Sequence, residues 1–251
     1  MRSFSVILLC FLSFFVGCLF TSSFMSIDNQ GGNAGESVLN NKVMKVHAGL
    51  RKSISPSNDL IIVIISAPAH YDRRQLIRET WAKDAKDSNF SYLFCIGAAS
   101  LRDEVFSALK HEQLSHNDLI LLPQVHESYN LLTKKVLRTF VWLSKNTDHR
   151  LVLKCDDDSF INVKELVKSP MLKSKDLLYW GYFTGRAPVH RRGKWKESEW
   201  NICDHYVPYA RGGGYVLSRF LIKYLADHAH MFRLAILVLP LNLQSHINLA
   251  F

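Results

Sequence analysis

The stretch LVLKCDDDSF (residues 151–160) joins a short apolar run directly to three adjacent carboxylates. An apolar run of this length is typical of a buried strand. Acidic side chains at the carboxyl end of such a strand lie where open α/β sheets bind ligands. Because like charges repel, a divalent cation that bridges to a phosphate would favour the arrangement, whereas the plain alternative is a solvated acidic turn. This stretch alone leaves both interpretations open.

Strands and helices are predicted to alternate on both sides of this stretch. The run LIIVIIS is nearly continuous in β-branched residues, which is typical of a strand covered on both faces. The alternation predicts an α/β fold with a doubly wound, mostly parallel sheet and right-handed crossovers. The predicted strands span residues 60–66, 92–96, 119–122, 150–154 and 177–181, and the predicted helices span residues 73–82, 101–113 and 131–145.

The bulk properties are those of a globular protein with anionic partners. The chain has 251 residues, of which 48% are hydrophobic and 21% charged, so one or two domains with a sizeable core are expected. The net charge of +9 favours nucleotide phosphates or polyanionic glycans as partners. Zinc-finger spacings and RNP-type aromatic motifs are absent from the sequence, so nucleic acid is not a predicted partner.

The amino-terminal part reads as a membrane signal followed by a linker. We expect residues 1–25 to form a cytosolic stub and a signal-anchor helix, because the apolar run is long enough to span a bilayer. Arg2 precedes the run and Asp28 follows it, which favours a cytosolic amino terminus and a lumenal body. A cleaved signal peptide is the alternative. Residues 26–57 are polar and are expected to form a stem.

Two features agree with a lumenal body. Asn89 opens the sequence Asn-Phe-Ser, an N-glycosylation acceptor. The cysteines beyond the apolar run are Cys95, Cys155 and Cys203, so one disulfide could form, and its pairing cannot be read from spacing. A buried, unpaired Cys155 inside the predicted strand is equally consistent with the pattern.

Two arginines follow the first predicted strand. Arg74 and Arg78 are four residues apart, so they share one face of the predicted helix. A pair of forked guanidinium donors near the carboxyl end of a strand suits a diphosphate. The alternative is a solvated basic face.

The acidic triplet has the ligands of a hard cation. If strand geometry persists, Asp156 and Asp158 project the same way while Asp157 points elsewhere. Carboxylates together with phosphate oxygens suit Mg²⁺ or Mn²⁺ rather than zinc. Lys154 is a candidate counter-charge.

Two further segments carry residue types that suit a sugar. Trp180, Trp195 and Trp200 lie in a stretch rich in aromatics and bases, and flat rings with nearby donors suit glycans, although core packing would also explain them. Gly212, Gly213 and Gly214 form a run that we expect to enter a helix and to let the backbone approach a ligand closely. A plain turn would also explain this run.

Taken together and in this order, five segments resemble the β-1,3-galactosyltransferase family of Golgi enzymes, glycosyltransferase family 31. The resemblance covers residues 58–232 and implies a GT-A fold, a type II Golgi membrane protein, UDP-galactose as donor, Mn²⁺ as cofactor and inversion at the transferred sugar. Details elsewhere in the chain imply a galactosyl-xylosyl acceptor on the glycosaminoglycan linker of a proteoglycan. The five segments are RRQLIRETW (73–81), YLFCIG (92–97), ESYNLLTKKV (127–136), LKCDDDSFINV (153–163) and YARGGGYVLS (209–218).

The resemblance also implies roles for individual residues. Asp158 would bind the metal directly and Asp156 would assist it, while the donor-binding set is Arg74, Arg78, Lys154, Asp156, Asp157, Gly212, Gly213 and Gly214. The tryptophans named above are the acceptor-side candidates.

The catalytic residue is left unknown by the resemblance. The family places its base in a Glu-Asp-Val motif after the helix that follows the Gly run, but this sequence has neither Asp nor Glu after Asp227. Residues 233–251 form an apolar tail unlike the family, and we expect the family domain to be incomplete. Two alternatives follow: an inactive form that binds UDP-sugar without transfer, and a non-enzymatic lumenal domain that binds glycans.

Overall fold

The computed structural model describes Val43 and residues 59–88, 90–174, 177–193, 196–197 and 203–232. The predicted signal-anchor helix, the stem apart from Val43, and the apolar tail, together with Asn89, Trp195 and Trp200, lie outside the described residues. Within the described ranges, the structure holds no helix long and apolar enough to cross a membrane.

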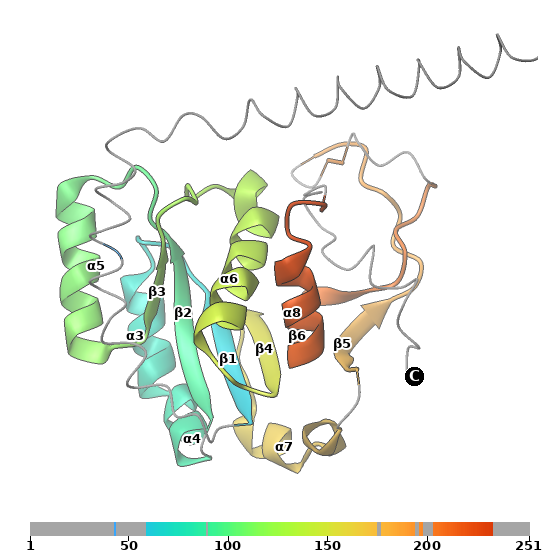
Figure 1. Cartoon of the computed structure of the whole chain (residues 1–251), viewed down its shortest axis with the longest axis horizontal. Helices are drawn as coiled ribbons and strands as arrows, with labels where there is room; N and C mark the ends of the chain where they lie inside the picture. Colours follow the sequence, from blue (N-terminus) through green and yellow to red (C-terminus); the bar gives the residue numbers. More distant parts are fainter. Residues whose placement is uncertain are drawn as a thin grey trace, which may run out of the picture. The chain divides into compact units, whose positions relative to one another are not determined.

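Strands and helices alternate along the described chain, as Figure 1 shows. Their order is β1 (Leu60–Ile65), α3 (Tyr71–Glu79), α4 (Trp81–Asp87), β2 (Ser91–Gly97), α5 (Asp103–His116), β3 (Leu119–Leu122), η2 (Tyr129–Leu131), α6 (Leu132–Asn146), β4 (Leu151–Asp156), α7 (Val163–Lys168), η3 (Pro170–Lys173), β5 (Tyr179–Thr184), β6 (Tyr209–Ser218) and α8 (Arg219–Asp227).

The strands form one six-stranded sheet in the order β3-β2-β1-β4-β6-β5. The pairs among β3, β2, β1 and β4 are parallel, and β6 pairs antiparallel with both β4 and β5. The predicted α/β fold with a mostly parallel sheet is therefore confirmed. The chain adds β2 and β3 on one side of β1 and then places β4 on its other side. The carboxyl ends of β1 and β4 thus flank a topological switch point, where open α/β sheets bind ligands.

Two predicted elements differ in the structure. The helix predicted over residues 73–82 is two helices, because the backbone at Thr80 leaves the helical region with φ −110° and ψ −115°. The prediction that the Gly run enters a helix is wrong, since residues 209–218 form the strand β6 and the helix begins only at Arg219. Glycine is depleted in strands, but residues on both sides of the Gly run pair with β5 and residues 214–218 pair with β4, and this pairing outweighs the weak local preference.

Both faces of the sheet are covered. Ile61, Val63 and Ile65 pack in one buried cluster with residues of α6 and α8. Strand residues alternate in direction, so Ile62 and Ile64 face the other side, and both are fully buried. The guanidinium of Arg78 lies 4.9 Å from the ring centroid of Phe94, which pairs with Ile64, and this places α3 on that second face.

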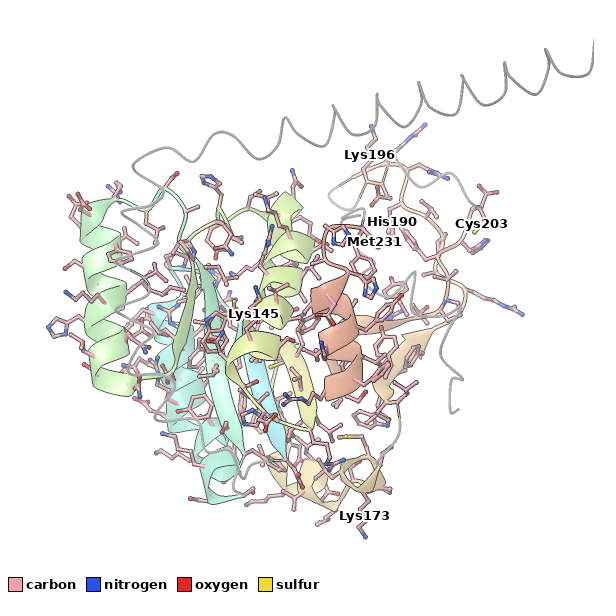
Figure 2. All side chains as sticks on the ribbon, viewed as in Figure 1. Lys145, Lys173, His190, Lys196, Cys203 and Met231 are labelled. Carbon is pink, nitrogen blue, oxygen red and sulfur yellow. The ribbon has the colours of Figure 1, made fainter. Side chains whose placement is uncertain are left out.

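The register of the sheet separates two cysteines. Cys95 pairs with Ile65 and Cys155 with Ile64, so their side chains lie on opposite faces of the sheet. Both are buried free thiols, which excludes a Cys95–Cys155 disulfide and confirms the alternative of a buried, unpaired Cys155. Cys203 is exposed in the connection between β5 and β6 (Figure 2).

Candidate functional site

The acidic triplet turns away from the sheet at the end of β4. The strand ends at Asp156, and the backbone N–H of Ser159 donates to the carbonyl of Asp156 at 3.1 Å. Strand geometry therefore does not persist, and the alternation that would align Asp156 with Asp158 does not apply. Asp156 is half-buried, Asp157 is buried and Asp158 is exposed. The three carboxylates thus meet three different environments.

Lys154 connects the acidic turn to the Gly run. Its buried Nζ lies 2.7 Å from Oδ1 of Asp156 and donates to the carbonyl of Gly212 at 2.8 Å. The predicted counter-charge contact is confirmed. A Cβ at position 212 would lie 3.9 Å from both Asp156 Oδ2 and Lys154 Nζ, an ordinary van der Waals contact, so Gly212 lies beside this ion pair. A Cβ at Gly213 would meet nothing within 4 Å, which leaves that part of the run open.

Asp157 is held by the loop that follows β1. Nδ1 of His70 lies 2.7 Å from Asp157 Oδ2, and Nη1 of Arg73 donates to Oδ1 at 3.0 Å. Burial acts to raise the pKa of Asp157, but hydrogen bonds from Ser66, His70 and Arg73 outweigh it and lower the pKa. Asp157 therefore stays ionised inside a cage of protein donors at the switch point.

Sequence reasoning missed His70 and Arg73. Both follow β1, and Asp157 follows β4, and the two strands are adjacent and parallel. The carboxyl ends of these two strands meet at one edge of the sheet, and this placement could have predicted that His70 and Arg73 lie near Asp157.

Arg74 and Arg78 lie inside the protein rather than on a solvated face. Arg74 binds Glu112 through two hydrogen bonds of 2.8 and 2.7 Å and also donates to the carbonyl of Ala67 at 2.6 Å. Arg78 binds Asp118 through two hydrogen bonds of 2.8 Å and Glu112 through one of 2.7 Å. Direct contact with a diphosphate stays a prediction for this pair, and the observed bonds brace the loop after β1.

The structure does not bring Trp180 to the acidic turn. Trp180 is about half exposed on β5 and pairs with Val216, whereas Lys154 pairs with the neighbouring Tyr215. Adjacent strand residues point to opposite faces, so Trp180 and Lys154 lie on opposite faces of the sheet. Its acceptor-side role stays a prediction.

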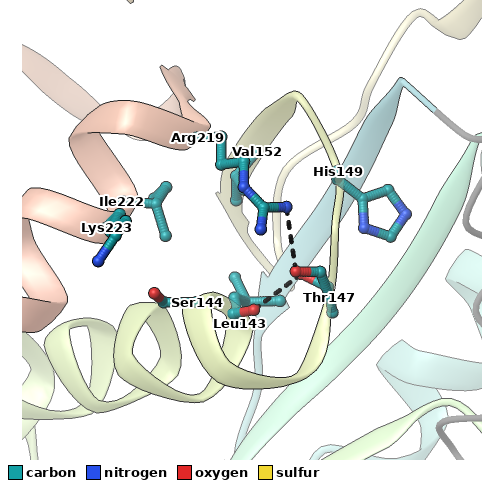
Figure 3. Close-up of a pocket in the computed structure, with 8 residues that line it drawn as sticks. All are labelled: Leu143, Ser144, Thr147, His149, Val152, Arg219, Ile222 and Lys223. Carbon is teal, nitrogen blue, oxygen red and sulfur yellow. Dashed lines mark hydrogen bonds between the residues drawn. The ribbon is translucent and has the colours of Figure 1, made fainter.

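Two cavities among the described residues bear on the site. The larger, of about 900 Å³, is lined by residues of α5, by Pro68 in the loop after β1 and by Tyr71 at the start of α3. The smaller, of about 130 Å³, lies at the opposite end of β4, as Figure 3 shows. The lining residues of the smaller cavity are Leu143, Ser144, Thr147, His149, Val152, Arg219, Ile222 and Lys223.

The acids present fit a divalent cation that shares its coordination with a ligand. No three His, Cys, Asp or Glu side chains of the described part are gathered as a complete metal site. Mg²⁺ and similar ions, however, are commonly held by one or two carboxylates plus substrate phosphates. Asp158 is exposed and Asp156 leaves Oδ2 outside its bond to Lys154, so these two carboxylates fit such a shared site.

The fold and the site define a class: α/β proteins with an acidic, cation-braced crevice at the switch point of a mostly parallel sheet. Comparison with known proteins narrows the class to a family. Residues 72–236 match the galactosyltransferase family, and the chain belongs to it.

Individual relatives agree with this assignment. The chain is 40% identical over 174 residues to β-1,3-galactosyltransferase 6 of Mus musculus, a match that covers 66% of this chain and 53% of the mouse protein. It is 31% identical over 173 residues to hydroxyproline O-galactosyltransferase GALT2 of Arabidopsis thaliana, which covers 67% of this chain and 25% of the plant protein. The chain therefore spans about half of the first relative and a quarter of the second.

A solved structure, galactosyltransferase LgtC in complex with donor and acceptor sugar analogues, overlaps 67% of this chain and 60% of its own. The identity is 12% and the TM-score 0.36, so the family assignment rests on sequence.

Proposed function

We propose that this protein binds UDP-galactose with Mn²⁺ and transfers galactose, with inversion, to a 3-hydroxyl of a galactosyl-xylosyl acceptor on the glycosaminoglycan linker of proteoglycans. The observation that carries the proposal is the meeting of Asp156, Lys154 and Gly212 beside the exposed Asp158, at the switch point of a chain that belongs to the galactosyltransferase family. Open α/β sheets bind their ligands at this edge.

The larger cavity, beside the loop after β1, has room for the nucleoside of a nucleotide sugar. The cavity of about 900 Å³ borders the same loop that braces Asp157, and its volume is within the range of small-molecule sites. Its Pro68 and Tyr71 offer apolar and aromatic surface to a base. The nucleoside would therefore lie on the β1 side of the acids and the sugar on the Gly-run side.

In the proposed site, Asp158 and Asp156 hold the cation. A bound divalent cation neutralises charge on the departing diphosphate. Lys154 fixes Asp156 and offsets its charge. Gly212 and Gly213 leave the backbone open for close approach of the donor sugar. No catalytic base is assigned among the described residues.

The proposed compartment is the Golgi membrane, with the catalytic part in the lumen and a single span near the amino terminus. The uncharged apolar run after Arg2 supports it. Co-localisation with a Golgi marker, together with protection of the body from protease in sealed vesicles, tests the placement.

The substitution D158N of the full chain tests the donor site. Because Asp158 is exposed and has no hydrogen bond or ion pair within the described part, the variant should fold as the wild type does. Loss of a metal ligand should weaken UDP binding in Mn²⁺ by tenfold or more, measured by titration calorimetry. The matched control is D227N, an exposed acid that pairs with Lys223 on α8 and should leave UDP affinity unchanged.

A transfer assay then separates the candidate functions. Transfer from UDP-galactose to a galactosyl-xyloside that depends on Mn²⁺ supports the enzyme. Tight UDP binding in Mn²⁺ without any transfer identifies an inactive donor-binding form. Wild-type protein that binds neither UDP nor Mn²⁺ would sink the proposal and favour a glycan-binding domain.

A further inference from the structure

Arg73 differs from the two arginines that sequence reasoning assigned to a diphosphate. The side chains of Arg74 and Arg78 are 1% and 7% exposed and are committed to Glu112 and Asp118. The side chain of Arg73 is 49% exposed. Within the described part, it makes a single hydrogen bond, from Nη1 to Asp157. A guanidinium carries five N–H donors in a fixed fork, so most of its donors are available to a ligand.

The tethered guanidinium lies at the crevice. Arg73 is in the first turn of α3, directly after β1, and its partner Asp157 stands between Asp156 and Asp158 after β4. The hydrogen bond of 3.0 Å therefore holds the cation against the acidic turn, at the edge where a metal-bound diphosphate would lie.

Asp157 has little capacity left for a ligand of its own. One carboxylate oxygen faces His70 at 2.7 Å, the other accepts from Arg73 at 3.0 Å, and Ser66 adds a further hydrogen bond. The carboxyl is buried, with its side chain 7% exposed. These partners suit an anchor rather than a metal or sugar ligand.

Charge balance requires a protein cation near the diphosphate. Lys154 already offsets Asp156, and a divalent ion on Asp158 and Asp156 leaves part of the diphosphate charge uncompensated. Among the arginines of α3, Arg73 is the one whose guanidinium is free to supply this positive charge. Holding the fork in place beforehand lowers the conformational entropy lost on binding.

We propose that Arg73 binds the diphosphate of the nucleoside diphosphate donor and that Asp157 is a positioning residue that holds Arg73 in place. The inference rests on the proposed donor site and deepens it. The diphosphate contact is thus assigned to Arg73 instead of Arg74 and Arg78. Asp157 is assigned to holding Arg73 instead of binding the donor directly.

The experiment measures UDP and uridine affinity, in Mn²⁺, for the full chain and for R73Q, R73K, D157N and the double variant R73Q/D157N. R73Q should weaken UDP about tenfold or more and leave uridine unchanged, because uridine has no phosphate. R73K keeps the charge but not the fork, so its loss should be intermediate. D157N should weaken UDP in the wild-type background and add nothing in the R73Q background.

The matched control is R219Q. Arg219 is also about half exposed and paired with an acid, Asp148, but it lies at the opposite end of β4, so UDP affinity should not change. Because Arg73 is itself half exposed, R73Q should fold, and circular dichroism confirms this for each variant.

Three results would overturn the inference while leaving the donor site intact: unchanged UDP affinity in R73Q, equal losses of UDP and uridine, or a D157N effect that is additive with R73Q. Absence of UDP binding by the wild-type protein is a different result, since it removes the donor site itself.

Discussion

At the scale of single residues, His149 stands out because its ring is buried without a partner. The residue is 3% exposed, and within the described part neither ring nitrogen has a hydrogen bond. Burial, together with the charge of nearby Arg219, lowers the pKa of His149 to about 4 against the opposing effect of Asp148. Figure 3 shows His149 beside the strand end with Arg219 and Thr147 nearby. The folded protein therefore keeps this imidazole neutral.

The neutral ring gives a pH dependence with a definite sign. In the unfolded chain His149 is protonated below about pH 6.5, whereas in the folded protein it is protonated only below about pH 4. The free energy of unfolding should therefore fall as the pH drops from about 6.5 to about 4. The contribution is on the order of 3 kcal/mol across the window. His149→Leu should flatten this part of the curve, measured by urea unfolding at several pH values.

The control for this prediction is His111→Gln, which alters an exposed histidine of α5. Carboxylates such as Asp157 and Glu112, whose pKa values are also lowered, lose their contribution as pH falls further in every variant, so they cancel in the comparison. Equal slopes in the wild type and His149→Leu would contradict the assignment.

Some residue-scale contacts could be predicted from sequence and others could not. Lys154 is two positions from Asp156 on one strand, so their contact follows from strand geometry. The contacts of Asp157 with His70 and Arg73 join residues that are 87 and 84 positions apart. They depend on where α3 begins and on which strand is adjacent to β1, and neither is visible in a local pattern.

At the scale of elements, a buried ion network joins α3, α5 and the start of β3. Arg74 is fully buried, and its partner Glu112 also binds Arg78, so removal of Arg74 leaves a buried carboxylate with one of its three hydrogen bonds from arginine. Breaking a buried pair on one side costs about 3–5 kcal/mol. Arg74→Met should therefore lower the free energy of unfolding by roughly that amount, measured by denaturant titration.

Lys83→Met on α4 is the comparison for this prediction. Lys83 is exposed and should change stability by no more than about 0.5 kcal/mol. A loss below about 1 kcal/mol in Arg74→Met would show that the network contributes little and that the pair is dispensable for the fold.

The network explains why the spacing of Arg74 and Arg78 alone could not predict whether their face of α3 is solvated or buried. The spacing of Arg74 and Arg78 correctly predicts a shared helix face, but Glu112 and Asp118 come 38 and 40 positions later in the chain. Whether a basic face is solvated or buried depends on such distant acids. The Gly run of β6 is a similar case, because the pairing of the flanking residues with β4 and β5 makes it part of a strand.

At the scale of the whole sheet, the parallel half was predictable and the antiparallel half was not. Apolar runs mark β1 to β4 clearly, and β3 has the predicted bounds. In β5 and β6, exposed aromatics and glycines replace the apolar run, so pattern reasoning finds β5 only in part and misses β6. Of these two strands, β6 borders the acidic turn through its pairing with β4, and its Gly run leaves the backbone open there.

The two buried thiols lie on opposite faces of the sheet, so the labelling rate of each thiol can report how often the helices on its own face open. Burial raises the pKa of Cys95 to about 11 and that of Cys155 to about 12, so neither reacts while its layer is closed. With Cys10 and Cys18 replaced by serine, a thiol reagent should label Cys203 first. Cys95 should then report the opening of the α6–α8 layer and Cys155 that of the α3 layer, each read by mass spectrometry of peptides. Different labelling rates would show which layer opens first, and a single common rate would show that the sheet loses both coverings in one event.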